Sequence, residues 1–233
     1  MARTLRARMR ERRRNGECDG LSGNFLVEPD SPSAEPLRAL RLALEARFGS
    51  RETRGLVFTS PLPGDGRSTI AANYALVAAH VQRPVLLIDA DMRKPSLHTM
   101  FDVPLAPGLV DVLRDRLDPW EATHTFPALG NLHVLTAGSS LPRPGDVAAS
   151  PAMGDLLEKA YADCESVVLD SPPVLVAADA SGLASHSMTE VVMIMNHSGK
   201  RRHLASALRK LTVTEAKIVG VVVNREGALT GDF

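Results

Sequence analysis

The chain has 233 residues, enough for one well-buried α/β domain with short appendages and too few for two full domains. Apolar residues (44 %) and charged residues (23 %) occur in proportions that exclude global disorder, and apolar runs such as PVLLI are far shorter than the roughly 20 residues of a membrane-spanning helix. The two cysteines form no C-x-x-C pair and the N-terminus does not resemble a secretory signal, so we expect a cytoplasmic protein with reduced thiols.

The N-terminal residues 1–14 form a basic arm. They hold seven arginines and one glutamate, so the formal net charge of zero leaves the rest of the chain with a net charge of −6. Such an arm can bind anionic lipid at the inner face of the membrane or an acidic partner, or it can be a solvated extension. We expect no nucleic-acid binding. The following residues are rich in Gly, Asp, Ser and Pro, so we assign 1–33 to an arm and linker and 34–233 to the folded domain.

Helical and strand patterns alternate from residue 34 onward. Helical periodicity or composition predicts helices over 34–48, 68–82, 108–117, 151–163 and 201–211. Short apolar runs predict strands over 55–60, 84–93, 131–138, 166–173, 190–195 and 217–225. Continuous apolar strands separated by helices indicate an α/β protein with a mostly parallel sheet covered on both faces. Ligands bind such sheets at the carboxyl ends of the strands.

The segment SPLPGDGRST (60–69) has the features of a phosphate-binding loop. Its glycines allow close approach of the backbone, and the helix that follows would direct N–H groups at phosphate oxygens. Ser68 has the position of a Mg²⁺ ligand. The pattern G-x-x-x-x-G-K-[ST] is broken twice, by Pro61 and by Arg67, so the loop alone is a weak signal. The candidate nucleotide-binding residues of the loop are Gly64, Asp65, Gly66, Arg67, Ser68 and Thr69.

Acidic residues end two further apolar strands. Asp89 and Asp91 follow the run LLI, a spacing at which carboxylates can reach a metal ion or take a proton from an attacking hydroxyl. Asp170 ends the run VVL, as the acid of a Walker B motif would. A single acid after a strand is most often a turn or cap residue, but three beside a glycine loop favour nucleotide and Mg²⁺ chemistry. We take Ser68, Asp89 and Asp170 as candidate metal ligands, and Asp89, Asp91 and Arg67 as candidate catalytic residues.

These segments resemble the bacterial tyrosine kinases of capsule and exopolysaccharide export. SPLPGDGRST, LLIDADMRKP and VVLDSPPVLVAADA are similar to the Walker A, A′ and B motifs of that family. AGSSLPRPGDVAASPAMGDLL is similar to its Ala-Gly-x-x-x-Pro-x-Pro loop, and Glu35, Arg38 and Arg41 match its E-x-x-R-x-x-R helix. The resemblance covers about residues 28–225.

This resemblance implies a P-loop NTPase-like three-layer sandwich that binds ATP and Mg²⁺ and transfers the γ-phosphate to protein tyrosine. It also implies self-assembly through the E-x-x-R-x-x-R helix. The implied partner is the cytoplasmic tail of a membrane polysaccharide copolymerase, which switches the kinase on.

Two departures from the family pattern leave alternatives open. Arg67 replaces a compact ammonium by a bulkier, planar guanidinium, so we expect nucleotide binding to survive better than phosphoryl transfer. The family's C-terminal tyrosine cluster has no counterpart, since the only tyrosines are Tyr74 and Tyr161, for which packing roles are expected. The chain is therefore either a kinase that acts on another protein or a catalytically impaired ATP-binding scaffold that regulates the copolymerase.

Three further positions complete the prediction. Asn224 matches a base-contacting position of related P-loop ATPases, and the alternative is a turn-forming role at the end of a strand. Asp179 is expected to cap the next helix or to support the magnesium site. A partition or division-type ATPase is a third reading, but Leu62 stands where those proteins carry a signature lysine.

Overall fold

The computed structural model describes residues 26–48, 54–81, 84–126, 129 and 131–224. The basic arm over 1–14 lies outside the described residues. Seven strands form one sheet in the order β3-β4-β2-β5-β1-β6-β7, in which β3 runs antiparallel to β4 and the other neighbouring strands are parallel. The strands are β1 (Arg54–Thr59), β2 (Val85–Asp89), β3 (Thr123–Phe126), β4 (Leu132–Leu135), β5 (Ser166–Asp170), β6 (Thr189–Asn196) and β7 (Ile218–Asn224).

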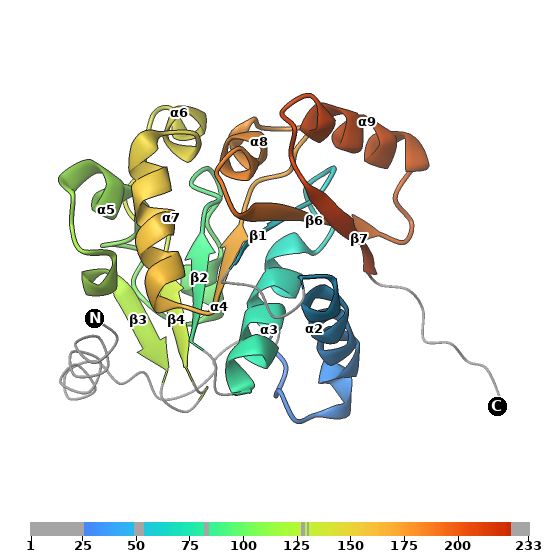
Figure 1. The fold of residues 1–233 in the computed structure, drawn as a ribbon, viewed down its shortest axis with the longest axis horizontal. Coiled ribbons are helices and arrows are strands. Elements are labelled where there is room, and N and C mark those ends of the chain that lie inside the picture. The colour runs from blue at the N-terminus through green and yellow to red at the C-terminus, as the bar shows by residue number, and fades with distance from the viewer. Residues whose placement is uncertain (1–25, 49–53, 82–83, 127–128, 130, 225–233) are drawn as a thin grey trace.

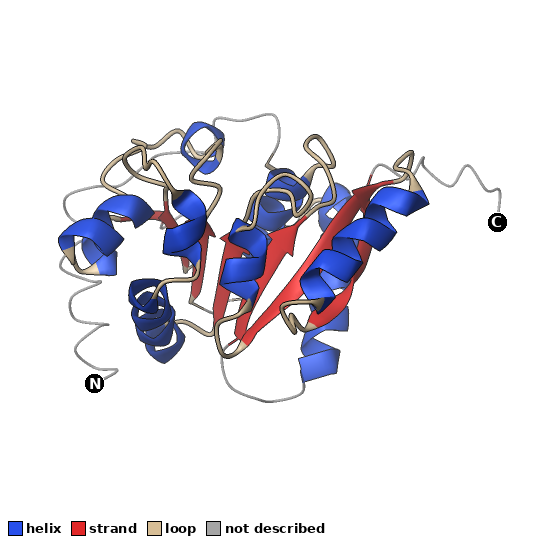
Figure 2. Cartoon of the chain, turned by 90° about the horizontal axis from the view of Figure 1, so that it is seen from above, coloured by secondary structure: helices blue, strands red, loops and turns tan. Residues whose placement is uncertain are grey.

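Helices cover both faces of the sheet (Figures 1 and 2). The α-helices are α2 (Glu35–Phe48), α3 (Arg67–His80), α4 (Leu97–Met100), α5 (Leu109–Asp115), α6 (Pro144–Ala148), α7 (Pro151–Asp163), α8 (Asp179–Ala184) and α9 (Arg201–Thr212), and the 3₁₀ helices are η1 (Pro32–Ala34) and η2 (Pro119–Glu121). Apolar side chains of α5 to α9 pack on one face of the sheet, and those of α2, α3 and α4 pack on the other. The three-layer α/β sandwich with a mostly parallel sheet is confirmed.

Each helix and strand expected from the sequence is present; the helix predicted over 151–163 has the predicted ends, and the others have shifted ends. The strands expected over 84–93 and 166–173 end at Asp89 and Asp170, because the residues after these acids turn away from the sheet as loops. The sequence prediction missed β3, whose four residues THTF lack an apolar run, since the strand lies at the sheet edge and only Phe126 is buried. It also missed the short helices α4 and α6.

The segment before α2 contacts the domain. The backbone N–H of Val27 donates to Asn73 Oδ1 at 2.7 Å, and Leu26 packs against the core on the α2 and α3 side. Leu26 and Val27, expected as part of a linker, therefore lie against the folded body. No helix among the described residues has the length and apolar content needed to cross a bilayer.

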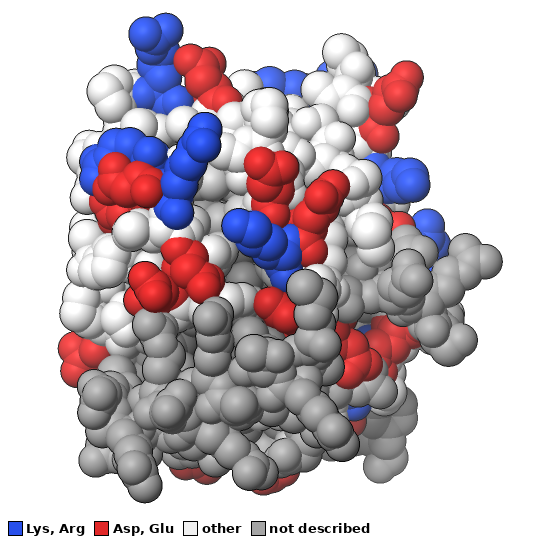
Figure 3. All heavy atoms as spheres, turned by 60° about the vertical axis from the view of Figure 1, so that its left-hand side comes forward, with Lys and Arg blue, Asp and Glu red and all other residues white. Residues whose placement is uncertain are grey.

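Charged side chains of both signs lie close together on the face shown in Figure 3. Ion pairs of both signs also occur within helices: on α5, Arg114 contacts Asp111 at 3.2 Å and Asp115 at 2.7 Å. Exposed pairs of this kind contribute little to stability.

Candidate nucleotide-binding site

The glycine loop connects β1 to α3 at the carboxyl edge of the sheet. Gly64 and Gly66 have φ angles of +86° and +88°, in the left-handed region that glycine adopts without steric cost. This geometry lets the chain turn directly into α3, of which Ser68 and Thr69 are the second and third residues. The first N–H groups of α3 therefore point out of the sheet edge, where they could bind phosphate oxygens.

Asp65 and Asn224 hold the loop in place. Asp65 accepts hydrogen bonds from the N–H of Leu62 at 3.1 Å and of Asn196 at 3.3 Å. Its carbonyl oxygen accepts from Asn224 Nδ2 at 2.9 Å. The side chain of Asn224 also lies against Gly66, because a Cβ at Gly66 would come within 2.0 Å of Nδ2. The structure therefore shows Asn224 bracing the phosphate loop, and the contact to a base that the sequence suggested stays a prediction.

The three predicted acids lie together beside this loop. β5 lies between β1 and β2, and the register pairs Asp89 with Asp170 across β2 and β5. Asp89 Oδ2 accepts from the N–H groups of Ser96 and Leu97, both at 2.9 Å, so this carboxyl group is tied to the start of α4. Burial and the nearby Asp170 raise the pKa of Asp89 to about 8, despite the opposing effect of these hydrogen bonds.

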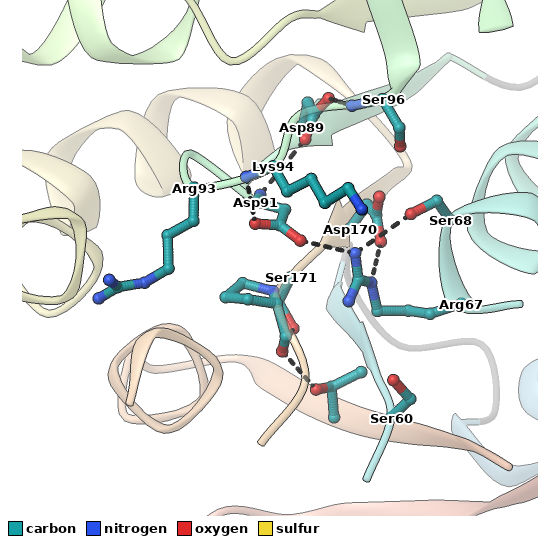
Figure 4. Close-up of polar contacts among 12 residues, drawn as sticks. Ser60, Arg67, Ser68, Asp89, Asp91, Arg93, Lys94, Ser96, Asp170 and Ser171 are labelled. Atoms are coloured by element: carbon teal, nitrogen blue, oxygen red, sulfur yellow. Dashed lines mark hydrogen bonds and ion pairs between the residues drawn. The ribbon is translucent and has the colours of Figure 1, made fainter. Parts of the chain in front are cut away.

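Arg67 bridges the two other acids (Figure 4). Its Nε donates to Asp170 Oδ1 at 2.6 Å, and its Nη2 donates to Asp91 Oδ2 at 2.8 Å and to Ser68 Oγ at 3.2 Å. Burial disfavours the guanidinium charge, but the carboxylates of Asp170 and Asp91 outweigh it and raise the pKa of Arg67. Burial likewise raises the pKa of Asp170, although Arg67 and Ser68 act in the opposite direction. The residue expected to hold phosphates is thus paired with the acids.

The oxygen atoms near the loop fit a magnesium ion in part. Asp170 Oδ2 is buried and has no hydrogen-bond partner. The hydroxyl of Ser68 lies next to the guanidinium of Arg67, which also binds Asp170. Hard oxygen donors of this kind suit Mg²⁺. Asp89 fits less well, because its oxygens accept backbone N–H groups. Among the described residues, no three His, Cys, Asp or Glu side chains converge as a ready metal-ligand set.

Comparison with known proteins decides the family. No protein-family model matches the sequence. The tyrosine-protein kinase YwqD of Bacillus subtilis is 34 % identical over 199 residues, which are 85 % of this chain and 84 % of that protein. The chain belongs to the bacterial tyrosine kinase family. The succinoglycan biosynthesis transport protein ExoP of Rhizobium meliloti is 31 % identical over 88 % of this chain, which spans only 26 % of the length of ExoP.

Solved structures of bacterial tyrosine kinases have the same fold. The chimerical protein CapA2B2 superposes with a TM-score of 0.79 at 29 % identity, over 88 % of this chain and 92 % of that chain. The kinase domain of Escherichia coli ETK superposes with a TM-score of 0.82 at 24 % identity, over 96 % of this chain and 88 % of that chain. The P-loop NTPase-like architecture inferred from the sequence is therefore shown.

The residues of the kinase family's E-x-x-R-x-x-R helix form ion pairs within α2. Arg38 contacts Glu35 at 2.6 Å, and its guanidinium also donates to the carbonyl groups of Pro29 and Ser31. Arg41 contacts Glu45 one helical turn later at 2.8 Å. These contacts fix the segment before α2 to the helix. Self-assembly through Glu35, Arg38 and Arg41 stays a prediction.

Arg93 and Asp179 form a second ion pair near the site, which the sequence did not reveal. Arg93 donates to Asp179 through Nε at 3.1 Å and through Nη2 at 3.0 Å, and the carboxylate is fully buried. Asp179 is the first residue of α8, whose N-cap is Ala178, so its side chain serves this pair instead of the expected cap. The pair ties the loop after β2 to α8, which keeps the loop bearing Asp91 against the site.

Both tyrosines of the kinase chain pack in the core, as expected. Tyr74 is 4 % exposed, and its ring lies 5.2 Å from that of Phe58. Tyr161 packs against the other face of the sheet, where its hydroxyl is buried without a hydrogen-bond partner. Burial raises the pKa of both hydroxyls. Neither side chain is available as a phosphate acceptor in the folded chain.

Proposed function

We propose that this chain binds ATP with Mg²⁺ and transfers the γ-phosphate to a tyrosine of another protein, as a regulator of exopolysaccharide or capsule production. The observation that carries the proposal is the position of the glycine loop, which lies directly beside the acids at the ends of β2 and β5. Membership of the bacterial tyrosine kinase family and the similarity to ExoP support the substrate class and the process.

Each element of the site has a role in this proposal. The N–H groups at the start of α3 and the loop around Gly64 and Gly66 would cradle the phosphates. Ser68 and Asp170 would hold Mg²⁺, which when bound neutralises phosphate charge. The substrate oxygen would bond to the γ-phosphorus as the bond to the bridging oxygen breaks, and Asp91 or Asp89 would take the hydroxyl proton.

Arg67 makes slow transfer the expected behaviour. Its guanidinium is held by Asp91 through Nη2 and by Asp170 through Nε, so these two pairs fix the orientation in which it could contact phosphate. Phosphoryl transfer depends on the positions of charged groups, and a misplacement of about 1 Å can cost roughly 10²-fold in rate. We therefore propose that Arg67→Lys phosphorylates faster than the natural chain. The cytoplasmic tail of a membrane polysaccharide copolymerase is the proposed activating partner.

A catalytically inactive scaffold is the second candidate. The ion pairs of Arg67, the burial of Tyr74 and the burial of the Tyr161 hydroxyl favour it. Transfer of radiolabelled γ-phosphate, with and without a copolymerase tail, separates the two. Label on tyrosine of the tail or of an added substrate supports the kinase, and ATP binding without label on any protein supports the scaffold. Calorimetry that detects no Mg²⁺-dependent ATP binding would refute both.

A further inference from the structure

The guanidinium of Arg67 lies among the groups proposed for a divalent cation. Its hydrogen bonds in the described structure go to Asp170 at 2.6 Å, Asp91 at 2.8 Å and Ser68 at 3.2 Å (Figure 4). The first two partners come from the ends of different strands, and the third is the loop hydroxyl that would bind the metal. A divalent cation at this site would take its ligands from the phosphate loop and from the residues at the ends of β2 and β5. Arg67 contacts each of these candidate groups except Asp89.

The three side chains are buried, so these contacts provide most of the charge balance at the site. The side chains of Arg67, Asp91 and Asp170 are 10 %, 5 % and 0 % exposed. Carboxylates with so little solvent need a nearby positive charge, and a buried pair in good geometry supplies it. A planar guanidinium can also donate hydrogen bonds to two carboxylates at once through different nitrogen atoms. An ammonium group has a single nitrogen and bridges two carboxylates less effectively.

A divalent cation at the same carboxylates would lie close to the guanidinium. Two positive groups repel each other strongly where burial weakens solvent screening. The arrangement of the acids agrees with this conflict, because Asp91 and Asp170 both bind the guanidinium, and among the described residues no three acids converge on one point. The unpaired Oδ2 of Asp170 is the remaining metal-binding oxygen, and it belongs to the same carboxylate that Arg67 holds.

We propose that Arg67 is a resident counter-ion of Asp91 and Asp170, and that it and a divalent cation exclude each other from these carboxylates in the nucleotide-free protein. The inference rests on the magnesium site of the proposed function, but not on ATP binding or phosphoryl transfer. It implies an order of loading. Because a triphosphate brings the negative charge that lets both cations stay, the metal enters with the nucleotide and not before it.

Mn²⁺ binding to the full chain tests this inference without nucleotide. The protein is stripped with EDTA, dialysed, and titrated with Mn²⁺ while free Mn²⁺ is measured by electron paramagnetic resonance. Removing the competing charge in Arg67→Ala should raise Mn²⁺ affinity by at least about tenfold over the natural chain. Adding Asp170→Asn to this variant should abolish the gain, because the unpaired carboxylate oxygen is lost.

Arg93→Ala is the matched control. It also removes an arginine from a buried aspartate at the same edge of the sheet, but it leaves the pair of Asp91 and Asp170 with Arg67 intact. Its Mn²⁺ affinity should stay well below that of Arg67→Ala, because Arg93 hydrogen-bonds to Asp179 and acts on Asp91 through its charge alone. The inference is overturned if Arg67→Ala binds Mn²⁺ no more tightly than the natural chain does, or if Arg93→Ala shows the same gain.

Folding of the variant is followed in the same experiment by circular dichroism. If Arg67→Ala unfolds in EDTA, recovery of the folded state on addition of Mn²⁺ supports the inference. In that case Arg67→Gln, which keeps a polar side chain of similar length, replaces it in the titration and should show the gain in affinity. Failure of the natural chain to bind ATP would refute the proposed function and leave this comparison unaffected.

Discussion

Substitution of Gly66 by alanine should destabilise the protein through two separable effects. A residue with a Cβ at a φ of +88° pays a backbone cost of about 1–2 kcal/mol. The new Cβ would also lie 2.0 Å from Asn224 Nδ2, so the side chain or the loop must move. Overpacking of this kind costs about 1–3 kcal/mol. We expect Gly66→Ala to lower the free energy of unfolding by about 2–5 kcal/mol, the sum of the two ranges.

Gly64→Ala provides the matched control. Its φ is +86°, but a Cβ at this position would have no heavy atom within 4 Å. The backbone cost is therefore the same and the clash is missing. In urea denaturation, Gly66→Ala should be less stable than Gly64→Ala by about 1–3 kcal/mol, which is the cost of the clash alone.

A double-mutant cycle with Asn224→Ala completes the test. Asn224→Ala alone removes the hydrogen bond to the Asp65 carbonyl and should cost about 1 kcal/mol. Because it also removes the obstacle, the double variant should be more stable than the sum of the single effects by about 1–2 kcal/mol. The reasoning is refuted if the two glycine variants are equally stable, or if the cycle is additive.

Three further predictions concern other parts of the fold. Burial lowers the pKa of His133 to about 4, so the native state holds this side chain neutral. The native state therefore loses stability as the pH falls from about 6.5 to 4, by at most about 3 kcal/mol. Urea titrations of His133→Leu should lack this loss, and an equal loss in both proteins would contradict the prediction. Arg93→Ala should lower the free energy of unfolding by about 1 kcal/mol, because solvent around this half-exposed arginine weakens its ion pair with Asp179. Arg114→Ala on the surface should change the stability little. Equal effects of the two substitutions in thermal melts would contradict a stabilising role for the buried carboxylate of Asp179. Burial raises the pKa of the Cys164 thiol, so this thiol should not react in the folded protein. Cys164→Ala and the natural chain should therefore react alike with a thiol reagent when folded, and should differ by one thiol when denatured. A difference in the folded state would show that the thiol is accessible.

The sequence predicted those parts of the site that depend on local pattern. The apolar runs before Asp89 and Asp170 predicted two buried strands, and parallel strands bring their carboxyl ends to one edge. The glycines at 64 and 66 indicated a phosphate-binding loop, and both have the positive φ angles that glycine adopts most readily. These inferences succeed because periodicity and conformational preference act over a few residues.

Side-chain partners that come from distant parts of the chain were not predictable in the same way. Arg67 was expected at phosphate but contacts Asp170, which lies 103 residues away, and Arg93 contacts Asp179 across 86 residues. Which acid an arginine meets depends on strand order and loop direction, and these follow from the packing of the whole sheet. The strand β3 escaped prediction for a related reason, since its pairing with β4 and not its own composition stabilises it.

The position of β5 in the sheet determines when the site can exist. β5 separates β1 from β2, so the loop, the Walker A′ acids and Asp170 meet only after a strand from the second half of the chain has inserted between two from the first half. Pairings between such distant segments form slowly during folding. A chain interrupted before residue 166 therefore has no complete site. A ligand that needs all three segments slows unfolding, but it does not speed the folding of the sheet.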